Sequence, residues 1–510
     1  MTSLPAVHPT VVHMLADAAE RAGDAQALVS GEGALTYRQY VRCAGGFAAE
    51  LLETGGAGDR VALVCGNSID MAVAMFAVHA ARMQAVPINP IYTERELRHI
   101  LSDAGPVAVI FDDDVGPLVE GLAGRLGIAA RFRIGGEGGR SLDEWRDDET
   151  AALPEPPPKP DELATLQYTG GTTGLPKGVD ITHGQLSINL SQREAVVPTV
   201  PDGETVLCVM PLFHVFASCM CLHLTAYCRG RLVIQRRYHP DQVLDAIERE
   251  GITVLPVGPT IFNGLMAMDR FAATDFSTLR TVYSGSAPLP VETLRKWREI
   301  TGTPILEGYG QTEAGPLLTS NVAGKPIVPG SVGPPVPETE IQIVDVETGG
   351  TVLAPGEEGE IRARGPQIMS GYRNRPEETA LALRGGWLYT GDIGRLDEDG
   401  ILWITDRKKD MVIVGGYNVY PREIDEVLFA HPNVVEAAAV GVPDDYRGEV
   451  IHAFVVLRDR TGDPQAALLD YCRDRLAKYK VPAHIHVVDR LMKTTVGKID
   501  KAAMRRSLTG

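Results

Sequence analysis

The chain has 510 residues, enough for two or more domains with large cores. Its hydrophobic content (44%) and charged content (23%) are typical of a globular protein, and its net charge of −17 makes nucleic acid a poor main partner. The charge is uneven, because residues 471–510 carry ten Lys/Arg against three Asp. We expect this basic tail to bind an anion or the acidic remainder of the chain. A solvent-exposed basic helix end would explain the uneven charge as well.

Seven cysteines show neither a C-x-x-C motif nor the spacing of a disulfide framework, which predicts reduced, mostly buried thiols in a cytoplasmic protein. Residues 1–24 lack the basic and apolar regions of a secretory signal. The most apolar window, residues 207–228, contains one proline and two histidines. We therefore expect a buried pocket wall there and no membrane span.

From residue 11 to residue 111, amphipathic and buried patterns alternate. Helices are predicted over 11–21, 37–53 and 69–82, and buried strands over 60–65 and 107–111. This alternation predicts a mainly parallel sheet covered by helices. A proline-rich segment, 154–160, is predicted to be a linker.

Residues 168–178 contain four glycines, three threonines and Lys177. Glycine lets the backbone approach a ligand closely, and exposed N–H groups with threonine hydroxyls and a lysine form an anion site. The spacing differs from that of the common P-loop, but a polyphosphate remains the expected ligand. A strand over 163–168 should precede the loop, and a helix from about His183, opened by a Thr182/Gln185 capping box, should come after it.

The alternation continues with predicted strands over 205–210, 231–234, 253–257 and 281–283, and predicted helices over 240–250 and 260–268. The segment 308–313 reads Gly-Tyr-Gly-Gln-Thr-Glu. Tyr309 offers a flat face to a base, and Thr312 can bond a phosphate. Glu313 would be repelled by a phosphate unless Mg²⁺ lay between them. The alternative for Tyr309 is an ordinary aromatic side chain in the core, and the alternative for Glu313 is an ordinary exposed carboxylate.

Beyond residue 338 the pattern becomes β-rich, which predicts a distorted barrel packed on the α/β body. Asp392 lies on a predicted turn and could accept paired ribose hydroxyls, although turns favour aspartate anyway. The charged segment 406–410 marks the predicted domain boundary. The remaining residues fit a small α+β domain of about 100 residues, which ends in a glycine turn bearing Lys498.

Together these motifs resemble the adenylate-forming superfamily of acyl-CoA synthetases, aryl-CoA ligases, beetle luciferases and peptide-synthetase adenylation domains. The resemblance covers nearly the whole chain and is strongest to bacterial medium- and long-chain fatty acyl-CoA ligases. It implies a large N-terminal domain (1–406) of α/β sheets plus a distorted β-barrel, a hinge (407–410) and a small mobile α+β domain (411–510). It also implies a two-step reaction, in which Mg·ATP converts a carboxylic acid to acyl-AMP and CoA then takes the acyl group.

The resemblance also assigns roles. Lys498, Thr312, Glu313 and His214 are implied to be catalytic, with Glu313 holding the metal and Lys498 bridging the carboxylate and the α-phosphate. The implied ATP- or AMP-binding residues are Thr169, Gly170, Gly171, Thr172, Thr173, Gly174, Lys177, Ser286, Ala287, Gly308, Tyr309, Asp392 and Arg407. Lys409 is the implied hinge residue, Gly415 and Gly416 line the CoA path, and Phe213, Val215, Phe216, Gly258, Gly285 and Gly315 line the acyl pocket.

The predicted acyl pocket is mostly apolar or small, with no buried Arg or Lys to seat a second carboxylate. This favours a monocarboxylic acid with an apolar tail. An aryl acid such as a benzoate or cinnamate is the second choice, and a non-catalytic binding scaffold is the alternative from another class. Ile413 stands where some relatives carry a lysine, and Met492 where a proline is common. A homodimer is compatible with the sequence.

Overall fold

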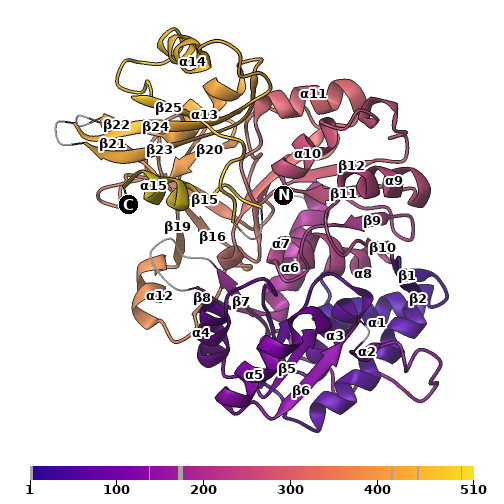
Figure 1. Ribbon diagram of the computed structural model, residues 1–510. Coiled ribbons are helices and arrows are strands. Elements are labelled where there is room, and N and C mark those ends of the chain that lie inside the picture. Colours follow the sequence, from indigo (N-terminus) through magenta and orange to yellow (C-terminus); the bar gives the residue numbers. More distant parts are fainter. Residues whose placement is uncertain are drawn as a thin grey trace.

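The computed structural model describes residues 4–136, 138–169, 176–414, 417–444, 447–494 and 497–509. It is a mixed α/β structure with four sheets, and the strands of the first two sheets alternate in blocks along the chain (Figure 1). The expected fold class is confirmed.

The first sheet has eight strands in the order β14-β13-β12-β11-β9-β10-β1-β2. Its inner strands are parallel, and β2 and β14 at the two edges are antiparallel. Their bounds are β1 Gln26–Ser30, β2 Gly33–Thr36, β9 Thr205–Cys208, β10 Arg231–Ile234, β11 Val254–Val257, β12 Thr281–Ser284, β13 Ile305–Gly310 and β14 Leu317–Ser320.

The second sheet has seven strands in the order β17-β8-β7-β4-β3-β5-β6. Their bounds are β3 Arg60–Val64, β4 Gln84–Pro87, β5 Ala108–Asp112, β6 Ala130–Ile134, β7 Leu163–Thr169, β8 Lys177–Thr182 and β17 Gly371–Tyr372. The helix α3 (Ile69–Ala80) contacts strands of both sheets and is buried from Met71 to Ala80, which explains its almost wholly apolar sequence.

The remaining helices of the α/β body cover these sheets. They are α1 Val11–Ala22, α2 Tyr37–Leu52, α4 Glu94–Ala104, α5 Gly116–Leu126, α6 His183–Val196, α7 Val215–Ala217, α8 Leu224–Cys228, α9 Pro240–Glu250, α10 Pro259–Met266 and α11 Val291–Thr301. The predicted capping box at Thr182 and Gln185 is present at the start of α6.

The predicted helix begins at His183 as expected, but one strand was not predicted. Between the glycine-rich loop and α6 lies β8, which pairs antiparallel with β7. Its alternation of buried Val179 and Ile181 with less buried Asp180 and Thr182 is the period of a strand with one face on the core. The loop therefore joins two strands of a hairpin.

A third, antiparallel sheet contains β15 Glu340–Val344, β16 Gly359–Arg364, β18 Leu383–Arg384, β19 Trp387–Leu396 and β20 Leu402–Arg407, with α12 (Pro376–Ala382) beside it. The fourth sheet contains β21 Val412–Val414, β22 Tyr417–Val419, β23 Val434–Asp444, β24 Gly448–Leu457 and β25 His484–Val487. Its helices are α13 Pro421–Phe429, α14 Pro464–Arg473 and α15 Lys501–Thr509. This last unit, orange to yellow in Figure 1, packs on the body through α13 and its C-terminal loop.

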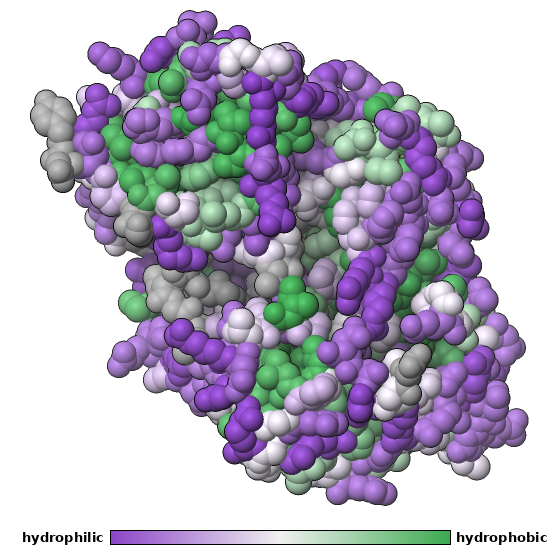
Figure 2. Space-filling view, viewed as in Figure 1, coloured by the Kyte–Doolittle hydropathy of each residue, from purple (hydrophilic) through white to green (hydrophobic). Residues whose placement is uncertain are grey.

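All seven cysteines lie in the described part of the chain, and all are buried and unpaired. Residues 215–228 form α7, a π-helical stretch over Ser218–His223, and α8, all within the core. Among the described helices, none combines the length and apolar character needed to cross a bilayer. The face in Figure 2 is mostly polar, with apolar side chains gathered over the C-terminal sheet and over the lower half of the body.

Candidate functional site

The strand β13 and the sheet that follows it form one wall of the site. Tyr309 donates a hydrogen bond from its hydroxyl to Oδ2 of Asp392 at 2.7 Å. Asp392 pairs in register with Arg407 across β19 and β20, and the Arg407 Nε lies 3.5 Å from its Oδ1. Burial raises the pKa of Asp392, while Arg407 and then Tyr309 oppose the rise.

Gly308 is required by its surroundings. A Cβ at this position would lie 1.9 Å from the Tyr283 hydroxyl oxygen, so no other residue fits without movement. Ser286 adopts a left-handed conformation (φ 70°) just beyond β12, next to Ala287. The ends of β12 and β13 therefore lie side by side at one edge of the sheet, where open α/β sheets bind ligands.

A second cluster forms around Glu313, which follows Thr312 in a short 3-10 turn. The Tyr372 hydroxyl donates a hydrogen bond to Glu313 Oε1 at 2.8 Å. Lys177 lies with its Nζ 5.1 Å from the centre of the Tyr372 ring. Burial raises the pKa of Glu313 above its ordinary value. Sequence reasoning missed Tyr372, since only the pairing of β17 with β8 brings it to this place.

Thr169 and Lys177 pair across the mouth of the glycine-rich loop. The loop residues Gly170, Gly171, Thr172, Thr173 and Gly174 lie outside the described residues, as do Gly415 and Gly416. Lys409 lies in an exposed turn between β20 and β21. Beside it, Lys408 donates from Nζ to Oε2 of Glu360 at 2.9 Å and to the Val346 carbonyl at 3.1 Å.

Lys498, in the C-terminal tail, lies near the clusters around Asp392 and Glu313. Its loop is closed by a hydrogen bond from the Thr494 N–H to the Lys498 carbonyl (2.7 Å), and Gly497 takes a φ of 78°. A Cβ on Gly497 would lie 3.8 Å from Thr260 Oγ1, so the loop rests on the start of α10.

The charges around Lys498 come from both preceding clusters. Burial lowers the pKa of Lys498 to about 8; Arg407 adds to this, while Asp392 and Glu313 oppose it. The structure thus brings together Lys498, Asp392, Glu313 and Arg407, which are far apart in the sequence.

His214 lies at the start of α7. Its Nδ1 accepts a hydrogen bond from the Phe216 N–H at 3.2 Å, which leaves the proton of the neutral ring on Nε2. Burial, and then the charge of Lys498, lower the pKa of His214 to about 3. The ring is therefore neutral at physiological pH.

Three of the predicted acyl-pocket residues, Phe216, Gly285 and Gly258, lie next to one another. Phe216 stacks on Tyr283 (ring centres 6.3 Å apart), and a Cβ on Gly285 would lie 2.5 Å from the Phe216 ring. Gly258 lies next to Gly285, since a Cβ there would be 3.8 Å from the Gly285 carbonyl oxygen. Gly315 has a φ of 75°, and Val215 is buried in the same core.

A small cavity of about 30 Å³ adjoins His214 and Phe213. Its other lining residues are Pro87, Ile88, Asn89, Tyr92, Ile100, Gln167 and Tyr168. Sequence reasoning did not single out Asn89 or Tyr92, because they belong to the loop after β4 and carry no motif.

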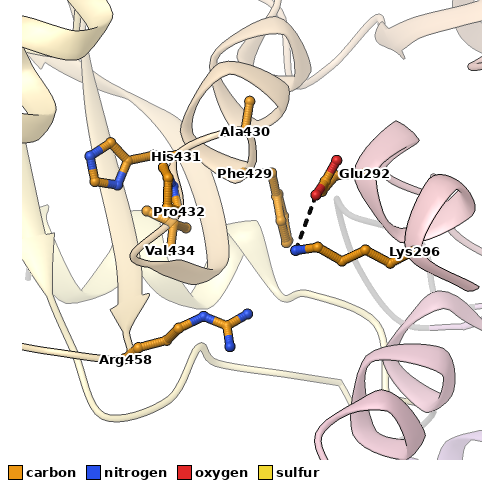
Figure 3. Close-up of a pocket in the computed structure, with 8 residues that line it drawn as sticks. All are labelled: Glu292, Lys296, Phe429, Ala430, His431, Pro432, Val434 and Arg458. Carbon is orange, nitrogen blue, oxygen red and sulfur yellow. Dashed lines mark ion pairs between the residues drawn. The ribbon is translucent and has the colours of Figure 1, made fainter. Parts of the chain in front are cut away.

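A larger cavity, of about 400 Å³, lies elsewhere and shares no residue with this site. Figure 3 shows it between α11, which supplies Glu292 and Lys296, and the C-terminal unit, which supplies His431 and Arg458. Glu292 and Lys296 form an ion pair at 3.1 Å. Its size alone does not make this cavity the reaction site.

Comparison with known proteins identifies the family. The sequence model described as AMP-binding enzyme matches residues 15–373, and the one described as AMP-binding enzyme C-terminal domain matches residues 423–498. The chain belongs to the AMP-binding enzyme family. It is an ATP-dependent, AMP-forming ligase.

Two relatives whose names give different acid substrates have the same sequence identity to this chain. A long-chain-fatty-acid–CoA ligase of Bacillus subtilis (strain 168) is 36% identical, with 97% of this chain and 94% of the relative covered. A feruloyl-CoA synthase of an Amycolatopsis species is also 36% identical, with 94% and 96% covered.

Solved structures agree on the fold. ATP-bound MatB from Rhodopseudomonas palustris is 33% identical, with a TM-score of 0.89 and 97% and 98% of the two chains covered. An anthranilate CoA ligase in complex with anthranoyl-AMP is 28% identical, with a TM-score of 0.92 and 99% and 98% covered.

Proposed function

We propose that this enzyme joins a monocarboxylic acid with an apolar tail, a medium- or long-chain fatty acid, to CoA in two steps. The carboxylate first attacks the α-phosphate of ATP, giving acyl-AMP and pyrophosphate. The CoA thiol then attacks the acyl carbon and releases AMP. The observation that carries the proposal is the half-buried Lys498, held among Asp392, Glu313 and Arg407 with a neutral His214 nearby.

Lys498 is the cation that stabilises the transition state of the first step. An ammonium group in a site shielded from water stabilises charge that develops on the carboxylate and the α-phosphate more strongly than in water. Burial and Arg407 lower the pKa of Lys498, and bound phosphates would raise it again and so favour the charged form.

The nucleotide is held by the two clusters on either side of Lys498. Asp392 accepts the ribose hydroxyls beside Arg407, and the edge formed by Gly308, Tyr309, Ser286 and Ala287 takes the adenine. Thr312, Thr169 and Lys177, with residues 170–174, bind the phosphates. Lys177 is suited to this role because its Nζ already lies 5.1 Å from the centre of the Tyr372 ring, whose hydroxyl is bonded to Glu313.

Glu313 is the residue that fits Mg²⁺. Its buried carboxylate has a raised pKa and, within the described part of the chain, only the Tyr372 hydroxyl as a side-chain partner. A divalent cation would favour its ionised form and offset the repulsion between carboxylate and phosphate. When bound, the metal supplies neutralisation of phosphate charge.

Between the two steps, the C-terminal unit rotates about Lys409 and withdraws Lys498. Gly415 and Gly416 then admit the thiol of CoA. Lys408 is anchored to Glu360 of the third sheet and to the Val346 carbonyl just after β15, so the backbone change falls on Lys409 and Asp410.

The pocket wall supports an acid with a single carboxylate. Arg193 of α6 is buried, but it is not one of the predicted pocket residues, and its guanidinium is bound by Glu194 and the Val197 carbonyl. Its charge is therefore compensated and is not free to seat a second carboxylate. Phe216, Val215 and the glycines leave an apolar wall, and the fatty-acid relatives match the chain over 97% of its length or more.

An aryl acid is the second candidate. The stacked rings of Phe216 and Tyr283 offer a flat face to an aromatic acid, and relatives with aromatic acids exist at similar identity.

The test is AMP formation with Mg·ATP and CoA across acetate, hexanoate, octanoate, palmitate, benzoate, 4-coumarate and malonate. Rates that peak on octanoate or palmitate support the proposal, and rates that peak on benzoate or 4-coumarate favour the second candidate. AMP release without dependence on CoA would point to another acceptor. No activity on any of these acids would refute both substrate proposals and favour a binding scaffold.

A further inference from the structure

Glu307 is a buried carboxyl group that the reaction above does not use. It lies on β13 directly before Gly308 and is 2% exposed. It accepts a hydrogen bond from the Leu289 N–H, but its Oε2 has no partner among the described residues. Ser284, its neighbour in register on β12, is fully buried and its Oγ likewise lacks a partner there. Buried polar atoms without partners are rare and costly, which points to a carboxyl that carries a proton.

The charged groups that act on Glu307 come from the C-terminal unit. Arg422 favours its ionised form and Glu426 disfavours it, and both stand on α13. The neighbouring strand β12 contributes the phenol of Tyr283 and the neutral Ser284. The charge balance at Glu307 therefore depends on where α13 lies.

The helix α13 binds the body at this place. The Glu426 carboxylate accepts a hydrogen bond from the Val291 N–H at the start of α11, and burial raises the pKa of Glu426. Arg422 lies with its Nε 4.0 Å from Glu426 Oε1. Glu307 and Glu426 therefore accept hydrogen bonds from N–H groups two residues apart, Leu289 and Val291, and Arg422 favours the ionised form of both. Two carboxyl groups with one guanidinium are neutral only when one of the carboxyl groups holds a proton.

We propose that Glu307 is a positioning residue for the domain rotation: it holds a proton while α13 covers it, and it releases that proton to water when α13 moves away. The inference rests on the rotation in the proposed function. Because Glu307 adjoins Gly308 and Tyr309, it couples the position of α13 to the strand that carries the adenine edge.

The direction of the pH effect follows from the pKa. Burial, which outweighs the opposing effect of Arg422, raises the pKa of Glu307 from 4.5 to about 8 in this arrangement. Once exposed, the group returns toward its ordinary value. The arrangement in this structure is then fully favoured below the ordinary pKa and loses favour as the pH rises toward about 8. For one proton, the ratio of rotated to unrotated enzyme rises by up to about tenfold per pH unit in this window and levels off above it.

A distance measurement tests this without relying on activity. Lys296→Cys and Arg458→Cys place spin labels on the two sides of the cavity in Figure 3, and the seven native cysteines are buried. Double electron–electron resonance on the full-length enzyme from pH 5.5 to 9 gives the fraction with the short distance. We expect this fraction to fall up to pH 8 and then to level off.

Glu307→Gln, similar in size and always neutral, should make the fraction independent of pH. The matched control is Glu299→Gln on the exposed side of α11, which should keep the dependence of the parent protein. An unchanged pH dependence in Glu307→Gln would overturn the inference. If Glu307→Gln does not fold, the test uses the labelled protein with native Glu307. Its short-distance fraction could stay constant across this pH range while octanoate with ATP, or added CoA, still changes the distance. That result would refute the role of Glu307 and leave the rotation intact. One fixed distance under every condition refutes the rotation itself.

Discussion

Replacing Gly308 by alanine should damage nucleotide binding through Tyr283. The added Cβ would lie 1.9 Å from the Tyr283 hydroxyl oxygen and 2.7 Å from its Cζ, whereas ordinary contacts begin at 3.4 Å. Tyr283 cannot move away easily, because it is 2% exposed, stacks on Phe216 and donates a hydrogen bond to Ser320 Oγ at 3.3 Å. The strand β13 or the ring must therefore shift.

The size of the effect follows from two costs. Overpacking a dense core costs about 1–3 kcal/mol. Losing the hydrogen bond between Tyr283 and Ser320 adds about 1 kcal/mol. If the whole strain falls on the strand that carries Tyr309, the affinity for ATP drops by roughly 30- to 1000-fold.

The assay combines calorimetric titration of ATP with urea unfolding of the same variant. Tyr283→Phe in the Gly308→Ala background removes the closest atom, so it should restore part of the loss, and the double-mutant cycle measures how much. Gly31→Ala is the control, because its Cβ would meet nothing within 4 Å. Unchanged ATP affinity together with an unchanged unfolding midpoint in Gly308→Ala would show that the strand is not constrained as argued.

Three further predictions concern the site. Lys498→Ala should slow adenylation by about 10²–10³-fold with ATP binding nearly intact. Full pyrophosphate release by Lys498→Ala would show that the lysine takes no part in the reaction. Because the pKa of Lys498 is lowered to about 8, kcat/KM for adenylation in the native enzyme should fall as the pH rises through about 8. Lys498→Arg should give a flat pH profile. Lys409→Pro should slow acyl transfer to CoA in stopped-flow measurements and spare adenylation, and an equal loss of both steps would contradict the hinge. Tyr309→Phe removes the 2.7 Å hydrogen bond to Asp392, so KM for ATP should rise about tenfold. The rise should be largest at low pH, because the Asp392 carboxylate loses a donor that lowers its pKa. The same KM in Tyr309→Phe as in the native enzyme at every pH would refute this coupling.

Much of the local structure was predictable from the sequence. The strand Arg231–Ile234 and the helix Pro240–Glu250 have the predicted bounds. Their signals are local: a proline at the start of the helix, a run of β-branched or apolar residues, and a glycine or charged residue at the ends. The capping box at Thr182 is likewise set by side chains three residues apart.

The strand β8 was missed for a physical reason. Its six residues directly follow the glycine-rich loop and directly precede a helix cap, and their pairing with β7 and β17 is not visible in the segment itself. The same pairing decides that Tyr372 reaches Glu313, a contact between residues 59 positions apart.

The sequence by itself determined the chemistry available to this protein: a glycine-rich anion loop, a carboxylate at Glu313, an aspartate on a turn and a lysine in a basic tail. Only the tertiary structure decided which of these groups share one site, and it also brought the charges of Arg422 and Glu426 close enough to act on Glu307. The reason is that burial and charge are properties of the assembled surroundings. A carboxyl or ammonium group keeps its ordinary pKa in an extended chain, and it acquires a new one only when strands, helices and the C-terminal loop exclude water around it and bring distant charges near.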